Sequence, residues 1–238
     1  MRIAIMQPTF LPWLGYFALM DYVDLFIYLD DVQISPNSFM TRNRIPDKRE
    51  SFTWLMIEES KVQTLQERFL NNTNIVDAAS AYSEISKKLY DRYNHDSLER
   101  FIPFLKKNLS NSNTVAQINI SLIQFLCQEI GISPKITRAS DLNSTGKKSK
   151  KILSILNNFE WSAYVVVPGA VEYMKLDEIW LGYEKRLKVF NYTPTSYKQN
   201  NVEEFIPYMS AIDALFELGS KDTLLKLREG VLGLKSWA

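Results

Sequence analysis

The chain has very few of the residues that build disulfides and transition-metal sites. Its 238 residues include one cysteine, Cys127, and one histidine, His95. A single cysteine excludes a disulfide or a thiolate zinc site within one chain, and a single histidine excludes a histidine metal cluster. Cys127 lies in the apolar pattern SLIQFLCQEIG, where a small buried hydrophobe is the expected role. We therefore predict no thiolate or histidine metal site and no cofactor, leave open whether a divalent metal bridges Asp30 and Asp31, and expect a reducing cytoplasm as the compartment.

An excess of charge, long apolar runs and linkers are also missing. The 28 basic and 27 acidic residues leave a net charge of +1, so there is no general electrostatic attraction to nucleic acid or to an anionic membrane. No stretch approaches the roughly 18 uninterrupted apolar residues that span a bilayer. Since no low-complexity tract or internal repeat interrupts the chain, we predict one unit over 1–238, with the oligomeric state left open.

What the chain does contain is an informative opening stretch, MRIAIMQPTFLPWLGYFALMDYVDLFIYLDDVQ. Residues 2–6 and 25–29 are short apolar runs typical of buried strands, and residues 13–22 have helical spacing. A strand, a helix and a second strand within this length indicate a right-handed crossover between parallel strands. We therefore predict an α/β fold with a Rossmann-like, largely parallel sheet.

Several candidate ligand-binding residues follow these two strands. Open parallel sheets bind ligands at the carboxyl ends of their strands. Gln7, Pro8 and Gly15 follow the first strand, and Asp30 and Asp31 follow the second. An amide, an approachable backbone and two carboxylates would then meet at one edge. The alternative is that Gln7-Pro8 is only a turn and the aspartates are a solvated strand end.

The next segment, VQISPNSFMTRNRIPDKRESFTWLMIEES, reads as extended chain and a hairpin. Strand alternation sends Arg42 and Arg44 to one face and Asn43 to the other. Two interpretations are open. The arginines neutralise Asp30 and Asp31 as ion pairs, or at least one of them holds a phosphate or carboxylate, which guanidinium geometry favours. On the second interpretation, these arginines, the aspartates and Gln7 line a common pocket.

Residues 61–109 are predicted to form a helical insertion. KVQTLQERFL is predicted as one helix, and SAYSEISKKLYDRYN places apolar residues at spacings of three and four, which is typical of an amphipathic helix. His95 precedes the start of the next predicted helix, in a loop, so we do not count it among the catalytic candidates.

Two turns in the second half of the chain are predicted to face the same pocket. The buried strand pattern over residues 164–167 runs into Pro168 and Gly169, where the backbone can approach a ligand closely. Tyr197 and Gln199 follow a strand predicted over residues 188–192. FIPYMSAIDALFELG is then predicted as a helix with Ser210 as N-cap, Asp213 in the capping-box position and Gly219 as C-cap, so that serine and aspartate need no functional role.

Seven phrases in order resemble one family. They are IAIMQPTFLPWLGYF, DLFIYLDDVQ, TRNRI, FTWL, Y-x-x-x-P-G-A-x-x-Y at residues 164–173, P-x-x-Y-x-Q at residues 194–199, and FIPYMSAIDALFELG. Together they resemble the WbqC-like family, which is associated with bacterial surface polysaccharide and O-antigen gene clusters. The pattern carries over to Gln7, Pro8, Gly15, Tyr16, Asp30, Asp31, Arg42, Asn43, Tyr197, Gln199, Ser210 and Asp213.

The resemblance implies an enzyme of O-antigen biosynthesis that transfers an acyl or aminoacyl group onto a nucleotide-linked amino sugar. In that hypothesis Asp30 or Asp31 is the catalytic base or holds the amine, and Arg42 or Arg44 binds phosphate. Gln7 and Asn43 orient the acceptor. The partners are then small molecules, namely the nucleotide-linked sugar and the acyl or aminoacyl donor.

Two alternatives remain open. The first is a non-catalytic protein that binds a sugar nucleotide or a partner, because the chain lacks a family histidine within SEISKKLYDRY and has no complete catalytic triad or metal set. The chain also departs from the family pattern at Pro168-Gly169. The second is a nucleotidyltransferase-like enzyme, which the opening strand, proline-containing turn and Gly-Tyr resemble. Trp13 and Tyr16 stand near where that class has histidines, so the chain lacks the imidazoles that stabilise a transferring phosphate there.

Overall fold

A largely parallel sheet forms the centre of the computed structural model, which describes residues 1–48, 51–112, 114–200 and 202–237. Its six strands run in the order β5 (Ile136–Arg138), β2 (Leu25–Tyr28), β1 (Arg2–Met6), β6 (Ala163–Val166), β7 (Leu187–Tyr192) and β8 (Val231–Ser236). All neighbours are parallel except β8, which runs antiparallel to β7. The predicted α/β fold is therefore confirmed.

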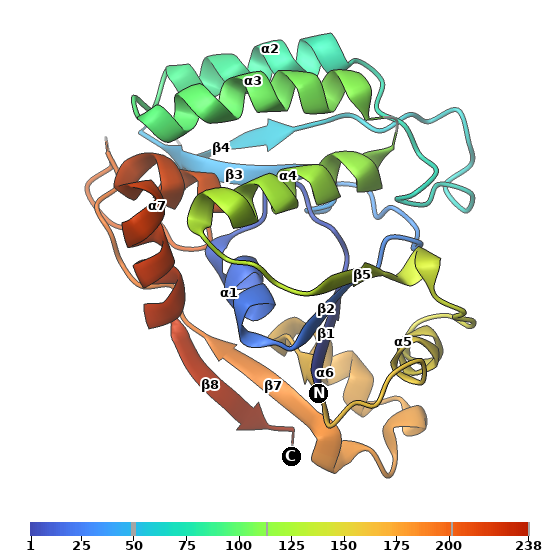
Figure 1. The fold of residues 1–238 in the computed structure, drawn as a ribbon. Coiled ribbons are helices and arrows are strands. Elements are labelled where there is room, and N and C mark those ends of the chain that lie inside the picture. Colours follow the sequence, from blue (N-terminus) through green and yellow to red (C-terminus); the bar gives the residue numbers. More distant parts are fainter. Residues whose placement is uncertain (49–50, 113, 201, 238) are drawn as a thin grey trace.

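Helices cover both faces of this sheet, as in Rossmann-like folds (Figure 1). One face packs against α1 (Leu14–Tyr22), α4 (Val115–Ile130) and α7 (Ala211–Glu229), and the other against α5 (Ser149–Leu156) and α6 (Pro168–Lys175). A hairpin of β3 (Arg42–Asp47) and β4 (Ser51–Met56) lies beyond α4 and carries α2 (Ala78–Tyr90) and α3 (Asp96–Asn111). Across the described residues, no helix combines the length and apolar character needed to span a membrane.

The strand sequences fit this two-sided burial. Successive side chains of a strand point to opposite faces, so an apolar run serves both cores. In β1, Ala4 belongs to the cluster with α1, α4 and α7, whereas Ile3 and Ile5 belong to the cluster with α5 and α6. In β2, Phe26 and Ile27 divide in the same way. The uninterrupted hydrophobicity of these strands follows from this arrangement.

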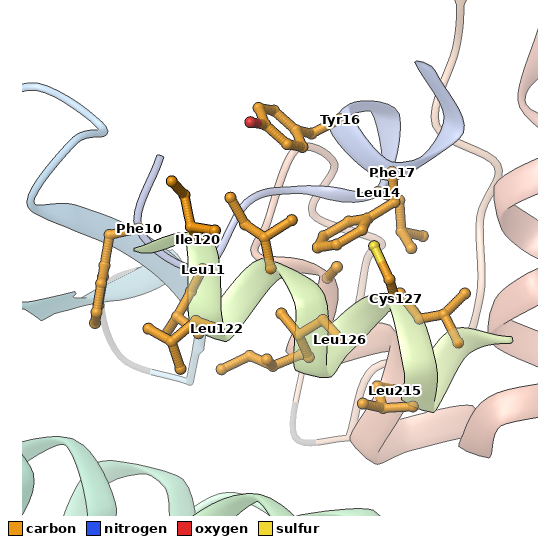
Figure 2. Packing of buried hydrophobic residues seen from close by; sticks show 14 of the residues in the cluster. Phe10, Leu11, Leu14, Tyr16, Phe17, Ile120, Leu122, Leu126, Cys127 and Leu215 are labelled. Atoms are coloured by element: carbon orange, nitrogen blue, oxygen red, sulfur yellow. The ribbon is translucent and has the colours of Figure 1, made fainter. Parts of the chain in front are cut away.

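The α4 helix supports the opening segment of the chain. Figure 2 shows Leu122 of this helix close to Leu11, and Cys127 close to Leu14 and Phe17, and all five side chains belong to one buried cluster. Cys127 is buried on the same helix, as predicted, and burial raises the pKa of its thiol to about 12. The helix ends at Gly131, whose φ of 88° is the left-handed conformation that glycine adopts readily.

The helix predicted over residues 61–70 is wrong. This segment forms turns, and its backbone bonds to an extended segment near β2: the amide of Ile34 donates to the carbonyl of Arg68 (3.0 Å), and that of Leu70 donates to Val32 (2.9 Å). Thr64 and Glu67 also bond locally through side chain and backbone. Pairing with residues 32–34 therefore outweighs the helix propensity of KVQTLQERFL.

The C-terminal helix continues further than predicted. Gly219 interrupts it with a non-helical φ of 74°, so the first helical stretch ends there as predicted, and a second stretch follows after the kink within α7. A Cβ atom there would lie 3.3 Å from Nε2 of His95, which lies at the start of α3 and accepts a bond from the amide of Ser97 through Nδ1 (3.0 Å). The chain then adds the edge strand β8, which the sequence analysis did not predict.

Candidate ligand-binding site

The segment that connects β1 to α1 is fixed by buried amide side chains from distant parts of the chain. Nδ2 of Asn119, on α4, donates to the carbonyl of Pro8 (2.8 Å). Nδ2 of Asn43, on β3, donates to the carbonyls of Phe10 (3.1 Å) and Leu11 (2.8 Å). Both asparagines are buried, so these bonds do not compete with solvent. The opening loop is consequently held in one conformation before any ligand arrives.

Leu11 shows how strongly this loop is held. Its φ of 44° is in the left-handed region that a branched side chain disfavours, and its side chain is fully buried. The carbonyl of Leu11 accepts from Asn43 and also from Oγ of Ser210 (2.7 Å). Ser210 is the N-cap residue of α7, as predicted, but its side chain makes no capping bond to that helix. Its hydroxyl instead joins the start of α7 to the opening loop.

Gly15 sets the position of the Trp13 ring. An ideal Cβ atom on Gly15 would lie 2.2 Å from Cη2 of Trp13, so any side chain would displace the indole. On the next residue, Oη of Tyr16 donates to the carbonyl of Gln7 (3.1 Å). Burial raises the pKa of Tyr16 well above its usual value, so the phenol keeps its proton and remains a donor. Gly15 and Tyr16, both predicted as ligand-binding residues, therefore shape the opening loop.

A cavity of about 380 Å³ lies where this loop faces the β3–β4 hairpin. Half of its lining residues are aromatic, and Trp13 and Tyr208 form one side, with ring centroids 5.3 Å apart. Its polar groups are a threonine, an asparagine and an arginine. The lining residues are Met6, Thr9, Trp13, Tyr16, Phe39, Asn43, Arg44 and Tyr208. A concave, mainly apolar site with a few polar groups is the usual form of a small-molecule site.

The two predicted arginines occupy one face of the hairpin. The guanidinium of Arg44 lies 4.9 Å from the ring centroid of Phe52 and 5.8 Å from that of Trp54. The guanidinium of Arg42 lies 4.2 Å from the Trp54 centroid, and its Nη2 donates to the carbonyl of Asn37 (2.6 Å). Among the described residues, neither arginine forms an ion pair with a carboxylate. Of the two, only Arg44 lines the cavity.

The two aspartates at the end of β2 have partners away from this cavity. Asp30 is buried and accepts from Ser140, through the backbone amide (3.0 Å) and through Oγ (2.7 Å). Asp31 pairs with Nζ of Lys151 (2.6 Å), while its Oδ1 has no hydrogen-bond partner among the described residues. Neither aspartate lines the cavity. The described side chains include no group of three or more metal-ligating residues.

Comparison with known proteins assigns the chain to a family. A model of the WbqC-like protein family matches residues 7–224. The chain belongs to this family. The uncharacterized protein Rv1507c of Mycobacterium tuberculosis is 24% identical over 227 residues, which cover 92% of this chain and 95% of that relative. No solved structure gives a significant match. The family match includes the cavity residues from Thr9 to Tyr208.

The remaining predicted residues of this WbqC-like protein are dispersed. Gln7 is exposed and Pro8 is buried beneath the opening loop. A turn was predicted at Pro168 and Gly169, but these residues begin α6 directly after β6. Proline occupies the first position of that helix, which helices favour. Both residues are exposed, and no other described group lies within 4 Å of a Cβ placed on Gly169. None of these four residues lines the cavity.

Tyr197 and Gln199 meet at Asp213, which the sequence analysis assigned to a capping box. Oδ2 of Asp213 accepts from Oη of Tyr197 (2.5 Å) and from Nε2 of Gln199 (2.7 Å), and its Oδ1 accepts from Oη of Tyr93 (2.7 Å). The capping role is therefore wrong. Burial raises the pKa of Asp213, although the three donors and Arg92 oppose this shift. We call Asp213, Tyr93, Tyr197 and Gln199 the Asp213 cluster.

The Asp213 cluster supports one wall of the cavity. Gln199 also binds both backbone groups of Ile206: the amide of Ile206 donates to Oε1 (2.8 Å), and Nε2 donates to the carbonyl (3.1 Å). Two residues later, Tyr208 has φ 61° and places its half-exposed ring against Trp13. The predicted residues Tyr197 and Gln199 thus contact the loop that carries Tyr208. Trp13, Phe39 and Tyr208 were not predicted as site residues.

Proposed function

We propose that this WbqC-like protein binds a nucleotide-linked amino sugar in the aromatic cavity and works in the biosynthesis of bacterial surface polysaccharide. The observation that carries the proposal is the composition of the cavity wall. Trp13, Tyr16, Phe39 and Tyr208 supply flat apolar faces, and Arg44 supplies a cation that no described carboxylate neutralises. Sugar and base rings pack on aromatic faces, and guanidinium binds phosphate through paired hydrogen bonds.

Size and rigidity support the same function. The cavity volume of about 380 Å³ falls within the range of roughly 300–1,000 Å³ that small-molecule sites occupy. Its loop is already fixed by Asn43, Asn119 and Ser210, so binding need not order that segment. The family resemblance to proteins of O-antigen gene clusters supplies the biosynthetic setting.

Acyl or aminoacyl transfer onto the amino sugar is the reaction that we attach to this binding. In that reaction the sugar amine attacks the carbonyl of an activated ester or thioester, the alcohol or thiol leaves, and a base accepts the amine proton. Asp31 is the better candidate for the base, because both oxygens of Asp30 already accept from Ser140, whereas Oδ1 of Asp31 lacks a partner among the described residues. Asp31 does not line the cavity and its Oδ2 pairs with Lys151, so this role requires the sugar amine to extend from the cavity to the end of β2. The Asp31 site lies beside β1, at the end of the neighbouring strand β2.

Binding is tested by calorimetric titration with a panel of UDP-, dTDP- and GDP-linked amino sugars. We expect saturable binding of at least one, and Arg44→Gln should weaken it by roughly tenfold or more through loss of a charged hydrogen-bond pair. Arg186→Gln is the matched control, since Arg186 packs on Trp161 away from the cavity, 5.1 Å from its ring centroid. No binding to any member of the panel, or equal loss in both variants, would overturn the proposal.

Catalysis needs a separate measurement. With a bound amino sugar and acyl or aminoacyl donors, we expect the wild type to form the N-acylated product and Asp31→Asn to form it much more slowly with unchanged sugar-nucleotide affinity. Equal turnover by Asp31→Asn would remove this carboxylate from the mechanism. Binding without turnover by the wild type would instead leave a non-catalytic sugar-nucleotide binding protein.

A further inference from the structure

The outer face of the β3–β4 hairpin has an unusual composition for a solvent-facing surface. Register pairs Arg42 with Met56, Arg44 with Trp54 and Pro46 with Phe52, and side chains of directly opposed residues share one face. The opposite face, with Ile45 and Leu55, is buried in the core. We call the set Phe39, Arg42, Arg44, Phe52 and Trp54 the hairpin face.

Both arginines of the hairpin face have unused hydrogen-bonding capacity. Nε of Arg42 and Nε of Arg44 are each shielded from solvent and have no hydrogen-bond partner within the described chain. An Nε–H donor that is shielded from solvent and unpaired is unfavourable, because shielded donors lose their bonds to water. Each arginine is otherwise partly exposed, and Nη2 of Arg42 donates to the carbonyl of Asn37. Contact with aromatic rings offsets part of this loss but leaves the charge without an anion.

The hairpin face is continuous with the cavity. Phe39 and Arg44 line the cavity and also belong to this face. The ring of Phe39 is 47% exposed and its centroid lies 6.3 Å from that of Trp54. The guanidinium of Arg42 adjoins the same Trp54 ring from the next outward-facing position of β3. A ligand that leaves the cavity past Arg44 therefore meets a second cation and further aromatic surface.

We propose that the hairpin face binds the nucleoside diphosphate part of the ligand, while the cavity holds the sugar. The diphosphate oxygens accept from Arg44 and Arg42, and the base packs against Phe39 at the exposed side of the face. This inference rests on the proposed function, since it assigns the two halves of one nucleotide-linked sugar to two adjoining surfaces. Two cations that lack acidic partners complement the charge of a diphosphate.

This arrangement predicts a dependence on the nucleotide that a sugar pocket alone would not show. The probe pair is UDP-glucosamine and glucosamine 1-phosphate, which share the sugar and the first phosphate. If another nucleotide sugar binds best in the panel, its own sugar 1-phosphate forms the pair. We expect the complete nucleotide sugar to bind at least about tenfold more tightly, because the truncated probe lacks the second phosphate and the base.

Arg42→Gln is the decisive variant, because Arg42 belongs to the hairpin face but does not line the cavity. This variant should bind the nucleotide sugar roughly tenfold more weakly than the wild type and should bind the sugar 1-phosphate with unchanged affinity. Arg42→Lys keeps the charge without the planar pair of donors, and an intermediate loss is expected. Arg186→Gln is the control for loss of an arginine stacked on an aromatic ring. Thermal unfolding of each variant, without ligand, identifies any that are misfolded.

The outcomes separate this inference from the proposed function. Equal affinity of wild type for the two probes, or an equal loss for both probes in folded Arg42→Gln, would overturn the assignment of the hairpin face while sugar binding in the cavity stands. Failure of every nucleotide sugar and sugar 1-phosphate to bind would overturn the proposed function itself. If Arg42→Gln does not fold, the Arg42→Lys measurement decides, and unchanged affinity for the nucleotide sugar in that variant counts against the hairpin face.

Discussion

Tyr197 donates its phenolic hydrogen to Oδ2 of Asp213 across 2.5 Å, and the carboxylate is entirely buried. Gln199 donates to the same oxygen and binds the backbone of Ile206. The pair therefore connects α7 to the loop that places Tyr208 over Trp13. A buried carboxylate with three donors is stable only while all three remain, so the Asp213 cluster ties the fold of α7 to the wall of the cavity.

Replacement of Asp213 by Asn should destabilise the protein. The amide that takes the place of one carboxylate oxygen cannot accept, so at least one buried donor of the Asp213 cluster loses its partner. We expect the free energy of unfolding to fall by about 1–3 kcal/mol, measured by urea denaturation. Asp222→Asn on the same helix is the control, because Asp222 is exposed and should change stability by less than roughly 0.5 kcal/mol. A similar loss in both variants would contradict the role of the cluster.

The stability of the cluster should depend on pH with a defined sign. Burial raises the pKa of Asp213 above its value in the unfolded chain, so the folded state binds the proton more readily. Its contribution to the free energy of unfolding is therefore largest at low pH and is lost as pH rises through the folded-state pKa. Arg92 and the Tyr197 hydroxyl oppose the shift, and Glu217, whose own pKa is also raised by burial, faces Arg92 as well.

Tyr197→Phe removes one of the donors that lower the pKa of Asp213, so that pKa should rise further. The difference in unfolding free energy between wild type and variant should then grow from acidic to alkaline pH, because the lost hydrogen bond stabilises the ionised carboxylate. Urea denaturation across this range measures it. Tyr90→Phe, at an exposed tyrosine, should show no such trend. A difference that is constant with pH would show that Asp213 does not change protonation in this range.

The two donors to Leu11 should act cooperatively. Asn43→Ala or Ser210→Ala alone leaves the carbonyl of Leu11 with one partner, whereas the double variant leaves this buried acceptor with neither. The double variant should lose more than the sum of the single losses, by roughly 0.5–3 kcal/mol in a double-mutant cycle. Asn43→Ala combined with Ser140→Ala should be additive, since Ser140 binds Asp30 and shares no acceptor with Asn43. Additivity of the first pair would show that the loop does not need both bonds.

The central strands and the family membership could be predicted from the sequence, because both depend on short contiguous stretches of it. The apolar runs at residues 2–6 and 25–29 became β1 and β2, and the family phrases fall in order along the matched range. Residues 61–70 were predicted wrongly because their backbone pairs with residues 32–34, a partner that helix propensity does not register. Local pattern is informative where local interactions decide the conformation.

The candidate site was harder to predict, since its residues meet only through tertiary structure. Trp13, Phe39 and Tyr208 come from three separate loops, and no short motif joins them. Asn119 and Asp213 did leave a signal, because each is a polar residue within an apolar helical run, INISLIQFL and AIDALF. Buried polar residues at such positions need partners, and here those partners are the opening loop and the cluster around Tyr197. The catalytic roles of Asp30 and Asp31 stay predictions.

Two glycines within helices should respond oppositely to the same substitution. Gly15→Ala would gain up to about 1 kcal/mol of helix propensity, but its Cβ would lie 2.2 Å from the Trp13 ring and must displace it. We expect a net loss of stability of roughly 1–3 kcal/mol and a disrupted cavity wall, detected by urea denaturation and by a change in tryptophan fluorescence. Gly169→Ala has no described neighbour within 4 Å of the new Cβ and lies in α6, so it should stabilise the protein by about 0.5–1 kcal/mol. Loss of stability in both variants would mean that the close approach of Gly15 to Trp13 is not what requires glycine at that position.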